Sequence, residues 1–205
     1  MPITIPNLLT LLRIALVPVF VLVFYLPVGW SGKICAVIFA LAAVTDWLDG
    51  YLARRLGQYS PFGAFLDPVA DKLMVAIALI LLVEADPTPA LAIPVLIIIG
   101  REITISALRE WMAELGVRAQ VAVTIIGKIK TAAQMVAITM LIYREPLWNL
   151  DIYIIGYVLL YMAAILTLWS MVLYLMAAWP SISADESPLP EPQEKPEEES
   201  PATGP

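Results

Sequence analysis

The chain contains long apolar segments, and these exclude an ordinary soluble fold. Residues 152–184 carry no charged side chain, and neither do residues 14–32. Segments of this length can cross a hydrocarbon core of roughly 30 Å, since a helix rises about 1.5 Å per residue. The whole chain is 60% hydrophobic, and its mean hydropathy of +0.84 exceeds that of soluble domains. The sequence therefore predicts an all-α integral membrane protein.

The four helices predicted between these two segments share another pattern, because each is apolar in one half and charged in the other. The apolar halves are residues 34–44, 73–83, 87–100 and 132–143. Each half is too short to span a bilayer alone. If the helices alternate in direction, every charged half falls on the same side of the membrane. The pattern predicts six transmembrane helices around a polar cavity open to one face, since intramembrane charges face the protein interior.

The basic residues indicate the face to which this cavity opens. Lys33 and Arg144 lie on the opposite side, and seven other basic residues of the predicted helices and loops lie on the cavity side. The positive-inside rule then makes the cavity cytoplasmic. We expect a multi-pass membrane protein with both termini in the cytoplasm. The basic residues on the cavity side are Arg54, Arg55, Arg101, Arg109, Arg118, Lys128 and Lys130.

The two ends of the chain differ from its centre. Residues 1–7 lack the Arg-rich start of a signal peptide, and we expect them to form a short interfacial segment before the first span. The polar residues Asn7, Thr10 and Arg13 fit either a helix start or the rim of a site. Residues 185–205 are rich in Pro, Glu and Ser, which predicts a disordered acidic tail. The predicted domains are a six-helix membrane domain over residues 1–184 and this tail, which alone accounts for the net charge of −6.

Four aspartates lie in an otherwise apolar region, where charged side chains are costly. Asp46 and Asp49 are three residues apart, and Asp67 and Asp71 are four apart, so each pair shares a helix face. Residues 58–61 suit a turn between the two helices. Four facing carboxylates would repel one another unless a cation joined them. Hard divalent cations such as Mg²⁺ prefer oxygen ligands and are often shared with substrate phosphates, so the aspartates predict a metal site.

Small and basic residues accompany the first aspartate pair. Gly50 and Ala53 would let a helix or a ligand approach closely, and Arg54 would reach an anionic oxygen. The alternative is structural, with the aspartates forming salt bridges to Arg54, Arg55 and Lys72. The chain has no histidine, so any general base must be Asp, Glu, Lys, Tyr or Cys.

A second polar group lies further along the chain. Arg101 and Arg109 are long enough to converge on one anion, and Lys128 and Lys130 follow in the sequence G-K-I-K-T. Several cations facing four aspartates and a metal indicate an anionic ligand beyond a diphosphate. Two alternatives are that Arg101 pairs with a glutamate of its own helix, or that these cations bind lipid head groups.

The spacing D-x2-D-G-x2-A-R-x8-G-x3-D-x3-D over residues 46–71 resembles the signature of the CDP-alcohol phosphotransferase family of integral membrane enzymes. Every position of that signature is filled. The stretches I-P-N-L-L-T-L-L-R, R-E-I-T-I-S-A-L-R-E-W-M-A-E-L-G and I-G-K-I-K-T are similar to the branch whose acceptor is glycerol 3-phosphate. The similarity extends to about residue 180 and leaves out the acidic tail.

The resemblance implies transfer of the phosphatidyl group from CDP-diacylglycerol to glycerol 3-phosphate, giving phosphatidylglycerol phosphate and CMP. It implies Mg²⁺ as the metal, with Mn²⁺ as an alternative, membrane lipids and a second copy of the chain as partners, and no nucleic acid. It assigns the roles as follows: Asp46, Asp49, Asp67 and Asp71 hold metal, with Asp71 the general base; Asp49, Gly50, Ala53, Arg54, Gly63 and Asp67 bind CDP; and Arg101, Arg109, Lys128 and Lys130 bind the acceptor phosphate.

Two competing functions remain at this point. One is a member of the same family that acts on another alcohol, such as inositol, serine or choline. The other is a cation transporter, whose carboxylates would lie near the membrane midplane. A transporter would spread its charges along the full depth of paired broken helices, whereas here the charges cluster on one side and no internal repeat is visible.

Overall fold

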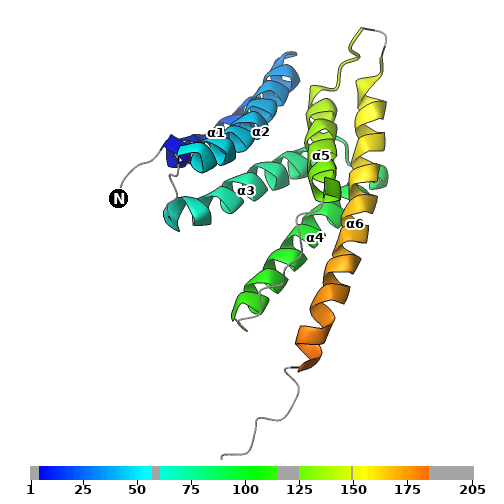
Figure 1. Ribbon diagram of the computed structural model, residues 1–205. Coiled ribbons are helices and arrows are strands. Elements are labelled where there is room, and N and C mark those ends of the chain that lie inside the picture. The colour runs from blue at the N-terminus through cyan, green and yellow to red at the C-terminus, as the bar shows by residue number, and fades with distance from the viewer. Residues whose placement is uncertain (1–4, 57–60, 115–124, 149, 185–205) are drawn as a thin grey trace, which may run out of the picture.

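The computed structural model describes residues 5–56, 61–114, 125–148 and 150–184, which form helices and connecting turns without a strand. In Figure 1, α1 and α2 lie side by side, α5 and α6 form a second pair, and α3 and α4 complete the bundle. The predicted acidic tail and Arg118 lie outside the described residues. The helices are α1 (Ile5–Phe24), α2 (Ser31–Leu56), α3 (Pro61–Ala85), α4 (Pro89–Glu114), α5 (Ile125–Tyr143) and α6 (Ile152–Ala184).

The helices alternate in direction, which is the condition that the sequence argument assumed, and polar contacts identify the end of the bundle remote from the signature. Tyr25, just after α1, donates a hydrogen bond to Glu84 near the end of α3 (2.5 Å). Lys33, near the start of α2, pairs with Glu145 just after α5 (2.8 Å). The charged halves of α2 to α5 therefore lie together at the other end of the bundle.

Apolar side chains of all six helices form the core. Phe20 of α1, Phe39 of α2, Leu79 of α3 and Ile138 of α5 are fully buried in one continuous cluster. The close approach of α5 and α6 requires a glycine, because a Cβ at Gly156 would lie 3.2 Å from the carbonyl oxygen of Ala137. Close van der Waals packing of these side chains, which drives helix association in a lipid environment, stabilises the bundle that carries the polar end.

Three of the helices are long and apolar enough to cross a membrane, namely α1 over Asn7–Phe24, α4 over Pro89–Ala113 and α6 over Ile152–Met176. One prediction about the first helix is wrong. Residues 5–7 are not part of a separate interfacial segment but the first turn of α1, which continues without a break to Phe24. The helix ends before the predicted limit at residue 32, because the chain turns at residues 25–30, where Pro27 lies.

A hydrogen-bonded cluster fastens the turn between α3 and α4 to α6. The carboxylate of Asp86 accepts hydrogen bonds from the hydroxyls of Tyr153 (2.6 Å) and Tyr157 (2.8 Å). One turn further along, the hydroxyl of Tyr161 donates to the carbonyl oxygen of Ala90 (2.8 Å). These contacts fix the ends of three helices on the side opposite to the signature aspartates.

We expect Tyr153→Phe to lower stability in a way that depends on pH. The bonds from Tyr153 and then Tyr157 lower the pKa of Asp86 below its ordinary value of 3.8. Their contribution is therefore fully present above pH 3.8 and is lost as the pH falls through the lowered pKa. At neutral pH we expect a loss of about 1 kcal/mol, or about 2–4 °C in Tm, for this solvent-screened bond.

Thermal unfolding in detergent between pH 7 and pH 3 checks this expectation, and Tyr161→Phe is the matched control. The control also removes a phenolic hydroxyl, but its partner is a neutral carbonyl, so its effect should not change with pH. A Tyr153→Phe effect that stays constant down to the lowest pH would contradict the role given to Asp86.

Candidate active site

The N-terminal half of α1 contacts the signature aspartates directly. The hydroxyl of Thr10 donates a hydrogen bond to Oδ1 of Asp67 in α3 (2.5 Å). The guanidinium of Arg13 pairs with Oδ1 of Asp46 in α2 (2.6 Å), and Arg13 is only 1% exposed. Asn7 is buried on the same segment. Of the two sequence interpretations of these residues, contact with the site is the correct one for Thr10 and Arg13.

The described aspartates have the chemistry that a hard cation requires. Asp46 and Asp67 each use one carboxylate oxygen toward α1, and the described residues place no hydrogen bond on the other oxygen of either group. Asp71 lies within electrostatic range of both Asp46 and Arg13. These oxygens fit the ligand set of Mg²⁺. Within the described ranges no three carboxylates form a complete metal cluster, and the side chain of Asp49 lies outside the described part.

Several other predicted positions also lie outside the described side chains. They are the CDP contacts Gly50, Ala53 and Arg54, and the acceptor contact Lys128. Their roles stay predictions from the signature. Gly63 is described and is buried in the first turn of α3.

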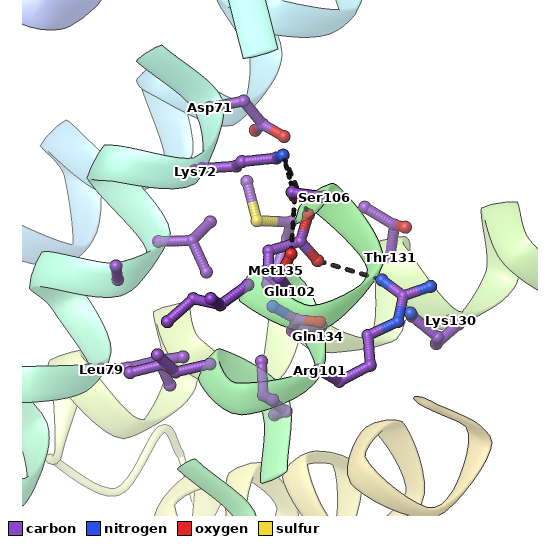
Figure 2. A pocket seen from close by; sticks show the side chains of 15 residues that line it. Asp71, Lys72, Leu79, Arg101, Glu102, Ser106, Lys130, Thr131, Gln134 and Met135 are labelled. Atoms are coloured by element: carbon purple, nitrogen blue, oxygen red, sulfur yellow. Dashed lines mark hydrogen bonds and ion pairs between the residues drawn. The ribbon is translucent and has the colours of Figure 1, made fainter. Parts of the chain in front are cut away.

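A cavity of about 480 Å³ lies between α3, α4 and α5, at the end of the bundle that carries the aspartates. Asp71 and Lys72 line it from α3, Arg101 from α4, and Lys130 from α5. Figure 2 shows Asp71 and Lys72 on one side of this space, with Arg101 and Lys130 on the other. The cavity therefore brings the predicted base together with two of the four predicted acceptor-binding cations.

The cations of the cavity are held by hydrogen bonds and charge. Arg101 donates to Oε2 of Glu102 (3.0 Å), and its Nε is buried without a hydrogen-bond partner among the described residues. Lys130 is only 6% exposed and lies within electrostatic range of Arg101 and Glu102. Lys72 pairs with Glu102 (3.8 Å). Arg101 and Lys130 are therefore largely buried cations, and such a pair is suited to binding an anion.

The structure separates Arg109 from Arg101. Arg109 does not line the cavity but lies over the ring of Tyr174 in α6, with its Cζ 5.6 Å from the ring centroid. Its charge still acts on Lys130. The two arginines thus do not converge on one point in this structure, and a role for Arg109 in acceptor binding stays a prediction.

The alternative interpretation, in which the charged residues form structural salt bridges, is correct in part, but most of the partners differ from those predicted. Arg101 does pair with a glutamate of its own helix, as one alternative proposed. Lys72 pairs with Glu102 rather than with an aspartate. Arg55 is exposed and contacts Tyr51. The cation that pairs with Asp46 is Arg13, which sequence spacing placed on a different helix.

The sequence interpretation missed the polar residues of the cavity between the predicted base and the cations. Glu102 and Ser106 lie on α4, four residues apart and hence on one face, and Thr131 and Gln134 lie on α5. The signal was present in the sequence, because Glu102 is an acidic residue next to a predicted anion-binding arginine.

We expect Thr10→Val to lower the catalytic rate because it removes the hydrogen bond that fixes Asp67. Valine keeps the branched shape, so about a tenfold loss is expected, equivalent to one hydrogen bond to a charged group. Thr139→Val is the matched control, since its hydroxyl bonds only to the carbonyl oxygen of Met135 on its own helix. Equal activities of the two variants would contradict a role for Thr10 in the site.

Comparison with known proteins identifies the class of protein that this bundle and its aspartate signature define. Residues 3–169 match the CDP-alcohol phosphatidyltransferase family, and the chain belongs to that family. The match spans all six helices up to the middle of α6, including every residue that lines the cavity. Members of this family are enzymes that generally use divalent metal ions.

The chain is also similar to individual bacterial proteins. It is 56% identical over 182 residues to the CDP-diacylglycerol–glycerol-3-phosphate 3-phosphatidyltransferase of Pseudomonas fluorescens, covering 88% of this chain and 93% of that protein. It is 57% identical over 178 residues to the proteins of the same name from Escherichia coli (strain K12) and Shigella flexneri, covering 87% of this chain and 96% of each relative.

Proposed function

We propose that this protein transfers the phosphatidyl group of CDP-diacylglycerol to glycerol 3-phosphate, giving phosphatidylglycerol phosphate and CMP. The observation that carries the proposal is a cavity in which the signature aspartate Asp71 faces the cations Arg101 and Lys130. The names of the relatives describe the same donor and the same acceptor. An acceptor that carries its own phosphate needs such cations, whereas inositol, serine or choline does not.

The residues of the cavity have separate roles in the proposed reaction. Arg101 and Lys130 bind the acceptor phosphate, assisted by Lys128 and by the charge of Arg109. This orients a terminal hydroxyl of the acceptor toward Asp71, which accepts its proton as the hydroxyl attacks the phosphorus next to diacylglycerol. The bond from that phosphorus to CMP breaks, and CMP leaves. No covalent enzyme intermediate is expected, because no side chain of the cavity is an activated nucleophile.

The site would hold Mg²⁺, or Mn²⁺ in its place, through Asp46, Asp49, Asp67 and Asp71. The ion would neutralise the negative charge of the donor's diphosphate and of the departing CMP. Thr10 and Arg13 orient two of these carboxylates from α1. The small residues Gly50, Ala53 and Gly63 would leave room for the cytidine. Arg54 would contact a phosphate, and the CDP group would also be contacted by Asp49 and Asp67.

We propose further that all six helices cross the inner membrane, with the cavity facing the cytoplasm. Three helices meet the length and hydropathy of a span, and the basic residues of the polar end favour the cytoplasmic side. The lipid donor would enter from the inner leaflet and the soluble acceptor from the cytoplasm. Residues 1–184 would form the catalytic domain of a homodimer, and the acidic tail would be dispensable.

The direct test is CMP release from CDP-diacylglycerol by the purified protein in detergent with Mg²⁺. Release that requires glycerol 3-phosphate is the expected result, and phosphatidylglycerol phosphate should appear in equal amount. Release with inositol, serine or choline in place of glycerol 3-phosphate would overturn the acceptor assignment but retain the family chemistry. Absence of release with every alcohol would contradict the enzyme function itself and would leave the cation transporter as the competing function to test.

A further inference from the structure

Glu102 occupies a central position in the cavity that the roles described above do not explain. Its carboxylate lies between two cations, with Arg101 on its own helix and Lys72 on α3. Figure 2 shows Glu102 and Ser106 in the space between Asp71 at one side and Arg101 and Lys130 at the other. The side chain of Glu102 is only partly buried (42% exposed), but any carboxylate in an anion-binding cavity would oppose the anion, so its presence requires a reason.

The two oxygens of Glu102 differ in their contacts. Oε2 accepts a hydrogen bond from Arg101 (3.0 Å). Oε1 lies 3.8 Å from Nζ of Lys72, which is too long for a hydrogen bond. Lys72 instead donates to Oγ of Ser106 (2.5 Å), and that hydroxyl donates to the backbone carbonyl oxygen of Glu102 (2.6 Å). Oε1 therefore keeps its capacity to accept a hydrogen bond, and Ser106 holds the lysine away from it.

The charges of the cavity show that Glu102 does not prevent anion binding. Lys72, Arg101 and Lys130 are three cations, and Asp71 and Glu102 are two carboxylates. One positive charge remains, and Arg109 adds to it from outside the lining. A phosphate on Arg101 and Lys130 is thus still attracted, while Glu102 acts on whatever part of the ligand lies between the phosphate and Asp71.

We propose that Oε1 of Glu102 accepts a hydrogen bond from the middle hydroxyl of a phosphorylated triol, and so selects glycerol 3-phosphate over acceptors that lack this hydroxyl. The inference rests on the proposed function. In glycerol 3-phosphate the hydroxyl on the second carbon lies between the phosphate and the attacking hydroxyl, and Glu102 lies between their two binding groups. A carboxylate accepts a hydroxyl proton more strongly than a neutral group does, since the bond is charge-assisted.

The test compares glycerol 3-phosphate with 3-hydroxypropyl phosphate, which keeps the phosphate and the attacking hydroxyl but lacks the middle one. The quantity measured is the ratio of kcat/KM for the two acceptors. The wild-type ratio should be well above one. Glu102→Gln should reduce this ratio about 3- to 30-fold, because the neutral amide makes a weaker bond. Glu110→Gln, on the exposed face of the same helix, is the matched control and should leave the ratio unchanged.

A second variant keeps the carboxylate and changes only its surroundings. In Ser106→Ala, Lys72 loses its hydroxyl partner and can donate to Oε1 of Glu102 instead. This occupies the atom that we assign to the substrate, so the same ratio should fall. The KM for CDP-diacylglycerol should remain at the wild-type value in both variants, which verifies that the fold and the donor site are intact.

The outcomes separate the inference from the function on which it rests. No acceptor-dependent CMP release by the wild type would overturn the proposed function, and the inference with it. An active wild type whose variants lose activity equally with both acceptors would overturn the inference alone, because a merely structural role of Glu102 predicts that result. A wild-type ratio near one would also overturn it.

Discussion

Replacing Asp71 by asparagine is expected to lower acceptor-dependent CMP release by about 10²- to 10⁴-fold, the usual contribution of a general base. Asparagine has the same size as aspartate but cannot accept a proton from the acceptor hydroxyl. The loss should appear in kcat, while the KM for glycerol 3-phosphate changes little, because Arg101 and Lys130 line the other side of the cavity. Initial rates with both substrates near saturation measure the effect.

Asp151→Asn is the control for that variant, since it makes the same chemical change far from the cavity. Asp151 caps α6, where its Oδ1 accepts hydrogen bonds from the backbone amides of Tyr153 (3.2 Å) and Ile154 (3.3 Å). Asparagine serves this capping role equally well, so activity and stability should both be retained. Residual activity of Asp71→Asn within tenfold of the wild type would remove Asp71 from the role of base.

Removal of divalent metal is expected to abolish turnover, because the negative charges of the diphosphate and of the departing CMP would be left unneutralised. Activity should fall to the background level in EDTA and return on addition of excess Mg²⁺. Asp67→Asn should raise the Mg²⁺ concentration required for half-maximal rate by about tenfold or more, since one charged ligand is lost.

Thermal unfolding provides a readout of the same site that does not depend on turnover. Mg²⁺ that binds the folded protein raises its Tm in proportion to the logarithm of the free ion concentration above Kd. This increase should be smaller in Asp67→Asn than in the wild type. Full activity in the presence of EDTA, with no effect of Mg²⁺ on Tm, would exclude the predicted metal site.

The sequence predicted the helices well because their causes are local. Uncharged stretches long enough to span a bilayer predicted α1 and α6, and the change from apolar to charged halves predicted that the charged halves of the others lie together if the helices alternate in direction. The bounds of the two helices on either side also followed from local chemistry, since α2 ends at Leu56 and α3 begins at Pro61. The start of α1 was misplaced because Arg13 was treated as a polar boundary, whereas in the structure its charge pairs with Asp46.

The side-chain contacts of the site were less predictable, because they depend on which helices pack together. Spacing within one helix places Arg101 and Arg109 at comparable positions, yet one lines the cavity and the other stacks on Tyr174 of α6. The pairing of Lys72 with α4 rather than with the aspartates likewise depends on the packing of α3 against α4. Signature spacing identified the type of chemistry, and tertiary structure determined which neighbours assist it.

The unbroken course of α1 links the site to the thickness of the surrounding bilayer. The same continuous helix that holds Asp46 and Asp67 through Arg13 and Thr10 exposes apolar side chains such as Leu22 further along. Such a helix responds to a thinner or thicker hydrocarbon layer by tilting, and the tilt moves both of its ends. Since we propose that α1 spans the bilayer, we expect the acyl-chain length of the host lipids to act on the geometry of the aspartates, which would make the physical state of the membrane an input to this enzyme.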